Sequence, residues 1–183
     1  MKINPTSIDG VVVVETTPFR DHRGDFARLY CDRELETIIG PRRIVQINRS
    51  CTRTVGAVRG MHFQYPPHAE MKLVRCVKGR VCDVAVDLRA GSPTFLKWHA
   101  EELDPENMRL LVIPEGCAHG FQVLEPDSEL FYLSTAFYTP DAEGGLRPTD
   151  PRPNIGWPLT VSDLSEKDAS QPLLPEDFPG ISL

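Results

Sequence analysis

Lysine, histidine and tyrosine side chains stand at strand-like positions of this chain, and together these residue types suit proton transfer beside a ketone. An ammonium group such as that of Lys72, held in a largely dry cavity, can stabilise the negative oxygen of an enolate. A histidine, which ordinarily titrates at about pH 6.5, can remove the adjacent proton at neutral pH. A tyrosine hydroxyl can return a proton from the opposite side. These residue types favour deprotonation and reprotonation at a carbon next to a carbonyl group.

Short strands are the elements that must position these side chains. Period-two alternation predicts strands over residues 11–15, 26–30, 44–50, 55–64, 71–77, 80–87, 110–113, 120–124 and 130–138. Helical patterns are confined to residues 33–39, after Asp32 as a possible N-cap, and to residues 165–168, which begin at Ser165. The chain is therefore expected to form an all-β sandwich or barrel with a few short helices.

Side chains two residues apart in a strand share a face. Gln46 and Asn48 therefore lie together, and so do Tyr132, Ser134 and Tyr138 in the last predicted strand. These two groups of polar side chains are candidates for the wall of a cavity.

The predicted strand 55–64 needs an irregularity to serve the same cavity. Arg59 and His62 have an odd separation, so a regular strand would send them to opposite faces. Gly60 lies between them and can carry a β-bulge that turns both side chains inward.

A turn at residues 78–79 connects two of the predicted strands. The Lys-Gly pair there predicts a two-residue hairpin that places Val77 opposite Arg80. Lys72 and Asp83 then become diagonal neighbours on one face, within reach of the long lysine.

Composition places the chain among ordinary globular proteins. It has 183 residues, 40% hydrophobic and 25% charged, so we expect a single domain over residues 1–183 with a proline-rich tail from about residue 140. The net charge of -6 and the lack of a basic run argue against a nucleic-acid partner. No stretch approaches the roughly 18 apolar residues of a membrane span, and no signal-peptide core follows the first residues, so we expect a cytoplasmic protein. The five scattered cysteines predict reduced thiols.

Two segments resemble the sequence motifs of cupins. Residues 114–121, PEGCAHGF, match the second motif, P-x-G-x-x-H, and Lys72 stands where the first motif, E-x6-G, has its glutamate. Metal-binding cupins hold a divalent ion with that glutamate and three histidines. Here a lysine replaces the anionic ligand, and Gln64 follows His62 where another histidine would stand, so we expect no metal and no cofactor. The resemblance implies a double-stranded β-helix, or jelly-roll, barrel whose mouth works with an ammonium group.

The sequence also resembles the dTDP-4-dehydrorhamnose 3,5-epimerase family, from about Val14 to Pro172. The matching segments are FRDHRGDF (19–26), QINRS (46–50), RGMHFQ (59–64), KLVR (72–75), DVAVDLR (83–89), SPTF (92–95), IPEGCAHGF (113–121) and LSEKD (164–168). Each segment alone is a weak signal, but the set is specific. The resemblance implies a cofactor-independent isomerase that inverts C3, C5 or both in a nucleotide-linked 4-keto-6-deoxyhexose, with dTDP-4-dehydro-6-deoxyglucose as the favoured substrate.

The resemblance also implies roles for individual residues. His62 matches the general base, Asp168 the carboxylate that orients it, Tyr132 the acid on the far face and Lys72 the group that holds the enolate. Positions that match substrate contacts are Arg23, Gln46, Asn48, Arg59, His119, Glu143, Lys167 and Tyr138, the last of which stacks on the nucleotide base. Asp83 joins these candidates because the predicted hairpin places it beside Lys72.

Three positions depart from the family pattern. Arg28 replaces a usual glutamate, Leu133 replaces a lysine, and residues 147–151 lack a tryptophan before Asp-Pro. Because the first change reverses a charge near the nucleotide-binding part, we expect an altered base preference, and a single-centre epimerase of a CDP-linked or other nucleotide sugar stays an alternative.

Two further function classes compete with the isomerase. A metal-dependent cupin enzyme is disfavoured by Lys72 and Gln64, and a cupin that binds a nucleotide sugar without turning it over is the other alternative. Ordinary structural roles are also open, since Asp168 stands third after Ser165 and could complete a capping box. Likewise, Lys72 and Asp83 could form a simple cross-strand pair.

A homodimer is the expected assembly. A strand over residues 26–30 could add to the sheet of a second copy, and the family that the sequence resembles forms dimers in this way.

Overall fold

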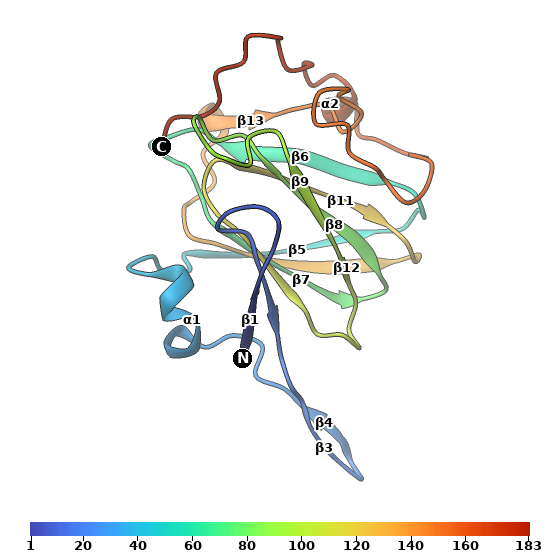
Figure 1. Ribbon diagram of the computed structural model, residues 1–183. Helices are drawn as coiled ribbons and strands as arrows, with labels where there is room; N and C mark the ends of the chain where they lie inside the picture. The colour runs from blue at the N-terminus through green and yellow to red at the C-terminus, as the bar shows by residue number, and fades with distance from the viewer.

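The computed structural model describes residues 1–183 as two antiparallel β-sheets packed face to face (Figure 1). The larger sheet has the strand order β1-β2-β10-β7-β12-β5, and the smaller has the order β13-β6-β11-β8-β9. From β6 onward most successive strands alternate between the sheets, which is the jelly-roll arrangement that the resemblance to cupins implied.

The strands of the two sheets are β1 (Lys2–Pro5), β2 (Val12–Glu15), β5 (Gln46–Thr52), β6 (Val58–Gln64), β7 (Lys72–Lys78), β8 (Val81–Asp87), β9 (Trp98–Leu103), β10 (Leu110–Ile113), β11 (Cys117–Val123), β12 (Ser128–Ser134) and β13 (Glu143–Gly145). A separate two-stranded ribbon pairs β3 (Phe19–Asp21) with β4 (Gly24–Phe26), and the helices are α1 (Asp32–Ile39), the 3-10 turn η1 (Pro140–Ala142) and α2 (Glu166–Ala169). No helix is long and apolar enough to cross a membrane.

The space between the sheets is divided into an apolar part and a polar part. The main core cluster draws Val74 and Leu130 from the larger sheet and Ala85 and Phe121 from the smaller one, all at most 1% exposed. Tyr132 packs against the edge of this cluster. Beyond it, where β5, β6 and β12 line the interior, the inward side chains are polar. A rigid apolar core therefore supports the floor of a polar cavity.

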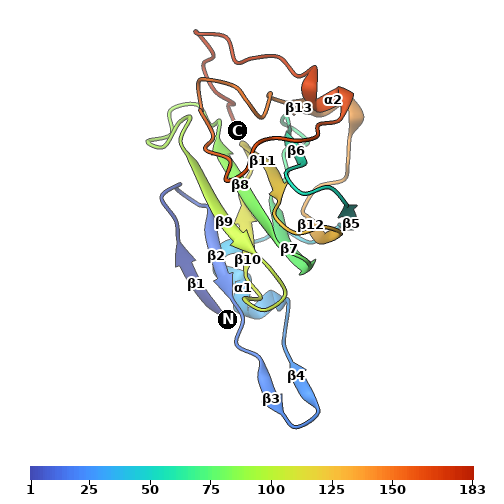
Figure 2. The same ribbon diagram turned by 90° about the vertical axis from the view of Figure 1, so that its right-hand side faces the viewer.

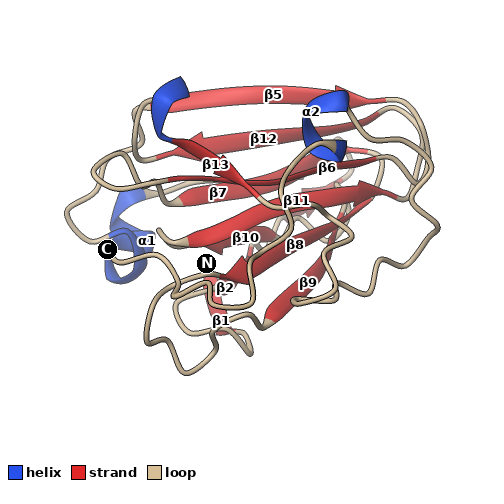
Figure 3. Ribbon diagram, turned by 90° about the horizontal axis from the view of Figure 1, so that it is seen from above, coloured by secondary structure: helices blue, strands red, loops and turns tan.

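The proline-rich tail covers the outer face of the smaller sheet. Val84 and Val86 point outward from β8 and pack with Ile155 and Ile181 of the tail. Since the other side of β8 faces the main core, all seven of its residues are buried, which explains its nearly continuous apolar sequence. Viewed from above, α2 lies beside β6, and the adjoining tail segment runs across this sheet (Figure 3).

The predicted hairpin at residues 78–79 is wrong. β7 pairs with β10 and β12 in the larger sheet, whereas β8 pairs with β11 and β9 in the smaller one. The turn therefore carries the chain from one sheet to the other. Lys72 and Asp83 are not cross-strand neighbours, although both side chains point between the sheets.

The predicted strand over residues 26–30 is also wrong beyond its first residue. Instead, β3 and β4 form an arm that projects from the barrel and exposes Phe19 by 78% and Phe26 by 73% (Figures 1 and 2). The base of the arm is fixed by Arg75, a buried side chain of β7 that donates to Thr16 Oγ1 (3.3 Å) and to the Leu29 carbonyl (3.2 Å). Burial lowers the pKa of Arg75 to about 10.

Several element boundaries differ from the prediction. The N-cap of α1 is Cys31, not Asp32, while Ser165 caps α2 as expected by accepting from the Asp168 N–H (3.0 Å). β12 ends at Ser134, so Tyr138 lies in the following loop. β1, β3, β9 and β13 lie outside the predicted strands, since each is short or half-exposed and lacks a clear apolar alternation.

Candidate active site

A cavity of about 600 Å³ opens between the two sheets, and all four proposed catalytic residues line it. His62 comes from β6 and Asp168 from α2, while Lys72 and Tyr132 come from β7 and β12 of the opposite sheet. Seven of the other predicted residues also line the cavity: Gln46, Asn48, Arg59, His119, Tyr138, Glu143 and Lys167. Asp83 lies fully buried behind His119, and Arg23 lies elsewhere.

The His62 imidazole is oriented by Asp168. Its Nε2–H donates to Asp168 Oδ1 at 2.6 Å, which leaves Nδ1 to accept a proton, and 31% of the side chain is exposed, toward the cavity. Asp168 Oδ2 accepts from the Gly60 N–H at 3.3 Å. Burial alone would raise the pKa of Asp168, but these bonds hold it below its ordinary value. An ionised Asp168 is therefore ready to stabilise a protonated His62.

A β-bulge turns the functional side chains of β6 toward the cavity, as expected. His62 is opposite His119 of β11, whereas Arg59, three residues earlier, is opposite Phe121, which is only two residues later. Gly60 lies in the bulge at a φ of +117°, and a Cβ there would stand 2.6 Å from the His119 carbonyl oxygen. Only glycine fits this close approach of two backbones.

A second histidine–aspartate pair lies beneath the cavity. His119 Nε2–H donates to Asp83 Oδ1 at 2.7 Å, and Oδ2 of the same carboxylate is buried without a partner. Burial raises the pKa of Asp83 above its ordinary value, although its contact with His119 partly offsets that effect. The pair fixes His119 with its Nε2 directed away from any ligand.

Tyr132 stands at the edge of the core with its hydroxyl in the cavity. The hydroxyl shares a hydrogen bond of 2.9 Å with Ser50 Oγ, and the ring meets that of His119 edge-on at 5.8 Å between centroids. Burial raises the pKa of Tyr132 above its ordinary value. The phenol is therefore neutral at physiological pH and can donate a proton.

Lys72 is almost enclosed by the wall of the cavity. Its ammonium group contacts the His62 carbonyl at 3.3 Å and Glu70 Oε1 at 3.1 Å, and the lysine and glutamate side chains are 15% and 11% exposed. The positive charge thus lies beside the backbone of the proposed base. Sequence reasoning did not identify Glu70, although its position two residues before Lys72 gives both side chains the same facing.

Three side chains form a charged rim. Glu143 of β13 accepts from Tyr138 Oη at 2.9 Å and from Lys167 Nζ at 2.7 Å. Burial would raise the pKa of Glu143, but these two bonds lower it, and the same bonds raise the pKa of Tyr138 and of Lys167. The rim places an exposed aromatic ring near a cation, and these are groups that suit a base and a phosphate.

Gln64, which the sequence marked only as a missing metal ligand, holds the loops around the rim. Its amide donates to the carbonyls of His68 (2.9 Å) and Phe137 (3.2 Å) and accepts from the Thr139 N–H (2.7 Å). This 2%-exposed side chain therefore fixes the segment that carries Tyr138.

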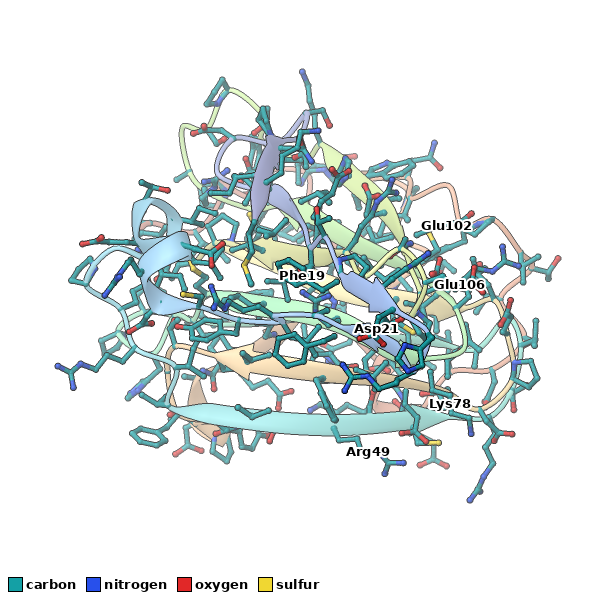
Figure 4. The ribbon with its side chains drawn as sticks, turned by 90° about the horizontal axis from the view of Figure 1, so that it is seen from below. Phe19, Asp21, Arg49, Lys78, Glu102 and Glu106 are labelled. Carbon is teal, nitrogen blue, oxygen red and sulfur yellow. The ribbon has the colours of Figure 1, made fainter.

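Arg23, an expected substrate contact, and Arg28, expected near the nucleotide-binding part, lie outside the cavity. Arg23 is on the projecting arm, where it donates to Asp21 at 2.6 Å. Seen from below, Phe19 and Asp21 mark this arm, and Arg49 marks β5 (Figure 4). Arg28 donates to Glu34 at 2.6 Å, so its reversed charge is paired within the chain.

Comparisons with known proteins agree along nearly the whole chain. A family model described as dTDP-4-dehydrorhamnose 3,5-epimerase matches residues 5–176. The dTDP-4-dehydrorhamnose 3,5-epimerase of Sinorhizobium fredii is 42% identical over 177 residues, which cover 96% of this chain and 91% of that protein. Among solved structures, the enzyme of the same name from Elizabethkingia anophelis aligns with a TM-score of 0.91 at 38% identity and 98% coverage of both chains.

A further solved structure holds a ligand. It is dTDP-6-deoxy-D-glucose-3,5-epimerase from Legionella pneumophila in complex with dTDP-4-keto-L-rhamnose, which aligns with a TM-score of 0.88 at 39% identity and covers 94% of this chain and 92% of that one.

Proposed function

The chain belongs to the dTDP-4-dehydrorhamnose 3,5-epimerase family, and from this we propose that it inverts both C3 and C5 of dTDP-4-dehydro-6-deoxyglucose. The observation that carries the proposal is the placement of His62 and Tyr132 on opposite sheets of one cavity, with the Lys72 ammonium between the sheets. A base and an acid on opposite sides of a sugar ring are what inversion at carbon requires.

In the first step, His62 Nδ1 removes the proton from the carbon next to the C4 ketone. The C–H bond breaks, and its electron pair moves to the ketone oxygen, which becomes an enolate. The imidazolium that forms is paired with Asp168 at 2.6 Å, so the new charge has a fixed counter-charge.

Lys72 stabilises the enolate oxygen. Its ammonium group donates to the His62 carbonyl and to Glu70, and it has a third N–H to donate. The bound sugar excludes water from the cavity. A positioned cation therefore stabilises the negative oxygen that develops in the transition state more strongly than it would in water.

In the second step, the Tyr132 hydroxyl delivers its proton to the opposite face of the same carbon. The enolate electrons form the new C–H bond, and the ketone is restored. The phenolate regains a proton from solvent, with the Ser50 hydroxyl 2.9 Å away as a relay, and the His62 imidazolium releases its proton to solvent, so both groups are ready for the next carbon. The same two steps apply at C3 and at C5, because both carbons flank the C4 ketone.

The dTDP part of the substrate is assigned to the rim and the adjoining strands. Tyr138 offers a ring to the base, and Arg59 and Lys167 offer cations to the phosphates. The Legionella pneumophila relative, crystallised with dTDP-4-keto-L-rhamnose, supports this choice of nucleotide and sugar.

The direct test is product analysis by NMR after incubation with dTDP-4-dehydro-6-deoxyglucose. The proposal predicts the doubly inverted 4-keto sugar. Accumulation of a product inverted at one carbon only would restrict the function to a single centre, and an unchanged sugar with measurable binding would favour a non-catalytic module.

We further propose that two copies form a homodimer through the arm of β3 and β4. The exposed Phe19 and Phe26 would be buried against the second copy. Arg23 does not line the cavity of its own chain, and in the dimer it would reach the cavity of the second copy. A monomeric mass in solution, measured by light scattering at micromolar concentration, would contradict this assembly.

The charged nucleotide sugar does not cross membranes, so we propose that the enzyme acts in the cytoplasm, where such substrates are made.

A further inference from the structure

Glu70 is a carboxylate of the cavity wall to which neither the reaction nor the sequence pattern gives a task. Its Oε1 lies 3.1 Å from Lys72 Nζ, and no other carboxylate lies within ion-pair distance of that lysine. Both side chains are at least 85% buried, so water screens the pair only weakly. The interaction therefore differs from an exposed surface ion pair, whose effect is small.

The backbone between the two residues is fixed. The Met71 N–H donates to Thr135 Oγ1 at 2.9 Å, and the Thr135 N–H donates to the Met71 carbonyl at 3.1 Å. The Met71 side chain is 3% exposed and packs in a core cluster beside Leu73. Glu70 and Lys72 thus project from a firmly held segment into the same cavity.

Two acceptors define the direction of the ammonium group. An ammonium has three N–H donors, and those of Lys72 are used by Glu70 and by the His62 carbonyl, which leaves one. Lys72 lines the cavity and both acceptors belong to its wall, so a ligand in the cavity can accept the remaining N–H. A flexible lysine with only one acceptor would lack this preorganisation.

Resting on the proposed function, we propose that Glu70 is a positioning residue for the epimerisation. Together with the His62 carbonyl, its carboxylate holds the Lys72 ammonium group in place, so that the remaining N–H can donate to the ketone oxygen. Glu70 itself touches neither the reacting carbon nor the transferred protons.

Two substitutions separate the charge of Glu70 from its hydrogen bond. Glu70→Gln keeps an oxygen that accepts from Lys72 but removes the negative charge, whereas Glu70→Ala removes both. Glu102→Gln is the matched control, because it removes a carboxylate from an ion pair with Arg80 that is exposed and lies on β9, away from the cavity.

The measurement is kcat and KM with the dTDP-linked 4-keto sugar. In Glu70→Gln, kcat stays within about threefold of the wild type, because the amide oxygen still accepts from the ammonium group. Glu70→Ala lowers kcat at least about tenfold while KM changes less than about threefold, since the ammonium group is misaligned but the contacts that bind the nucleotide remain. The control keeps the wild-type kcat and KM.

A double variant excludes a purely structural effect. In the Lys72→Met background, Glu70→Ala causes no further fall in kcat, because the group that Glu70 positions is absent. A wild-type kcat in Glu70→Ala, or an additive loss in the double variant, would overturn the inference. If the wild type itself turns over no 4-keto sugar, it is the proposed function that fails.

Discussion

His62 and Tyr132 approach one cavity from opposite sheets of the barrel, His62 from β6 and Tyr132 from β12. His119, directly opposite His62 on the neighbouring strand, also meets the Tyr132 ring edge-on. The two proposed proton-transfer groups therefore belong to one packed unit, and a six-membered ring bound between the sheets would present a different face to each.

Tyr132→Phe should separate proton removal from inversion. His62 would still remove and return a proton on its own face, so solvent deuterium would enter the sugar while the configuration is retained. We expect exchange at more than a tenth of the wild-type rate, with inversion reduced at least about 10²-fold. NMR of the sugar in heavy water measures both quantities. Loss of exchange and inversion in equal proportion would show that Tyr132 is not the far-side acid.

Asp168→Asn should reduce turnover while the cavity keeps its shape. The amide still accepts from His62 Nε2–H, but it cannot neutralise the imidazolium, so we expect kcat to fall by about 10²-fold or more. Steady-state kinetics and a crystal structure of the variant check this. A variant with the wild-type kcat would make Asp168 only the capping residue of α2.

Two buried aspartates should affect stability in opposite directions. Arg89, Ser92 and Thr94 donate to Asp87 and lower its pKa to about 2 despite burial, so its ionised form stabilises the fold. This contribution is complete above the unfolded pKa of about 3.9 and is lost as the pH falls toward 2. Asp87→Asn should cost about 2 kcal/mol at pH 7.

Asp83→Asn should instead raise the melting temperature at pH 7. Burial raises the pKa of Asp83, so the ionised carboxylate destabilises the folded state at neutral pH, and a neutral amide avoids that cost. The gain should shrink as the pH falls through the raised pKa, because the wild type then takes up its proton. Thermal melts of both variants from pH 4 to pH 8 test the signs, and a destabilised Asp83→Asn at pH 8 would contradict this reasoning.

Gly60→Ala should destabilise the protein and lower its activity. The new methyl group would meet the backbone of β11, and the positive φ adds a strain of about 1–3 kcal/mol for a residue with a side chain. Gly91→Ala is the control, because Gly91 also has a positive φ, of 71°, but no atom within 4 Å of the added Cβ. Denaturant unfolding should show a clearly larger loss at Gly60, and equal losses would contradict the bulge argument.

Strand periodicity was sufficient to predict an all-β sandwich or barrel, because it is a local feature, and the resemblance to cupins implied the jelly roll. It also grouped Gln46 with Asn48 and Tyr132 with Ser134, since residues two apart in a strand share a face. The bulge at Gly60 could also be predicted, because a regular strand would send Arg59 and His62 to opposite faces.

Long-range features could not be predicted in the same way. A lysine–glycine turn fits both a hairpin and a crossing between sheets, and only the packing of the whole barrel decides between them. The role of Gln64 in holding two loops depends on segments that meet only in the folded chain. The arm was misread because its pairing is confined to three residues on each strand.

Solvent exchange in His62→Ala tests the central claim most directly. The wild type and this variant are incubated with the dTDP-linked 4-keto sugar in heavy water, and deuterium at C3 and C5 is measured by NMR. We predict that exchange at both carbons falls by about 10²–10⁴-fold in the variant, while binding of the nucleotide sugar is preserved. Exchange at a near wild-type rate without the imidazole would contradict the assignment of His62 as the base.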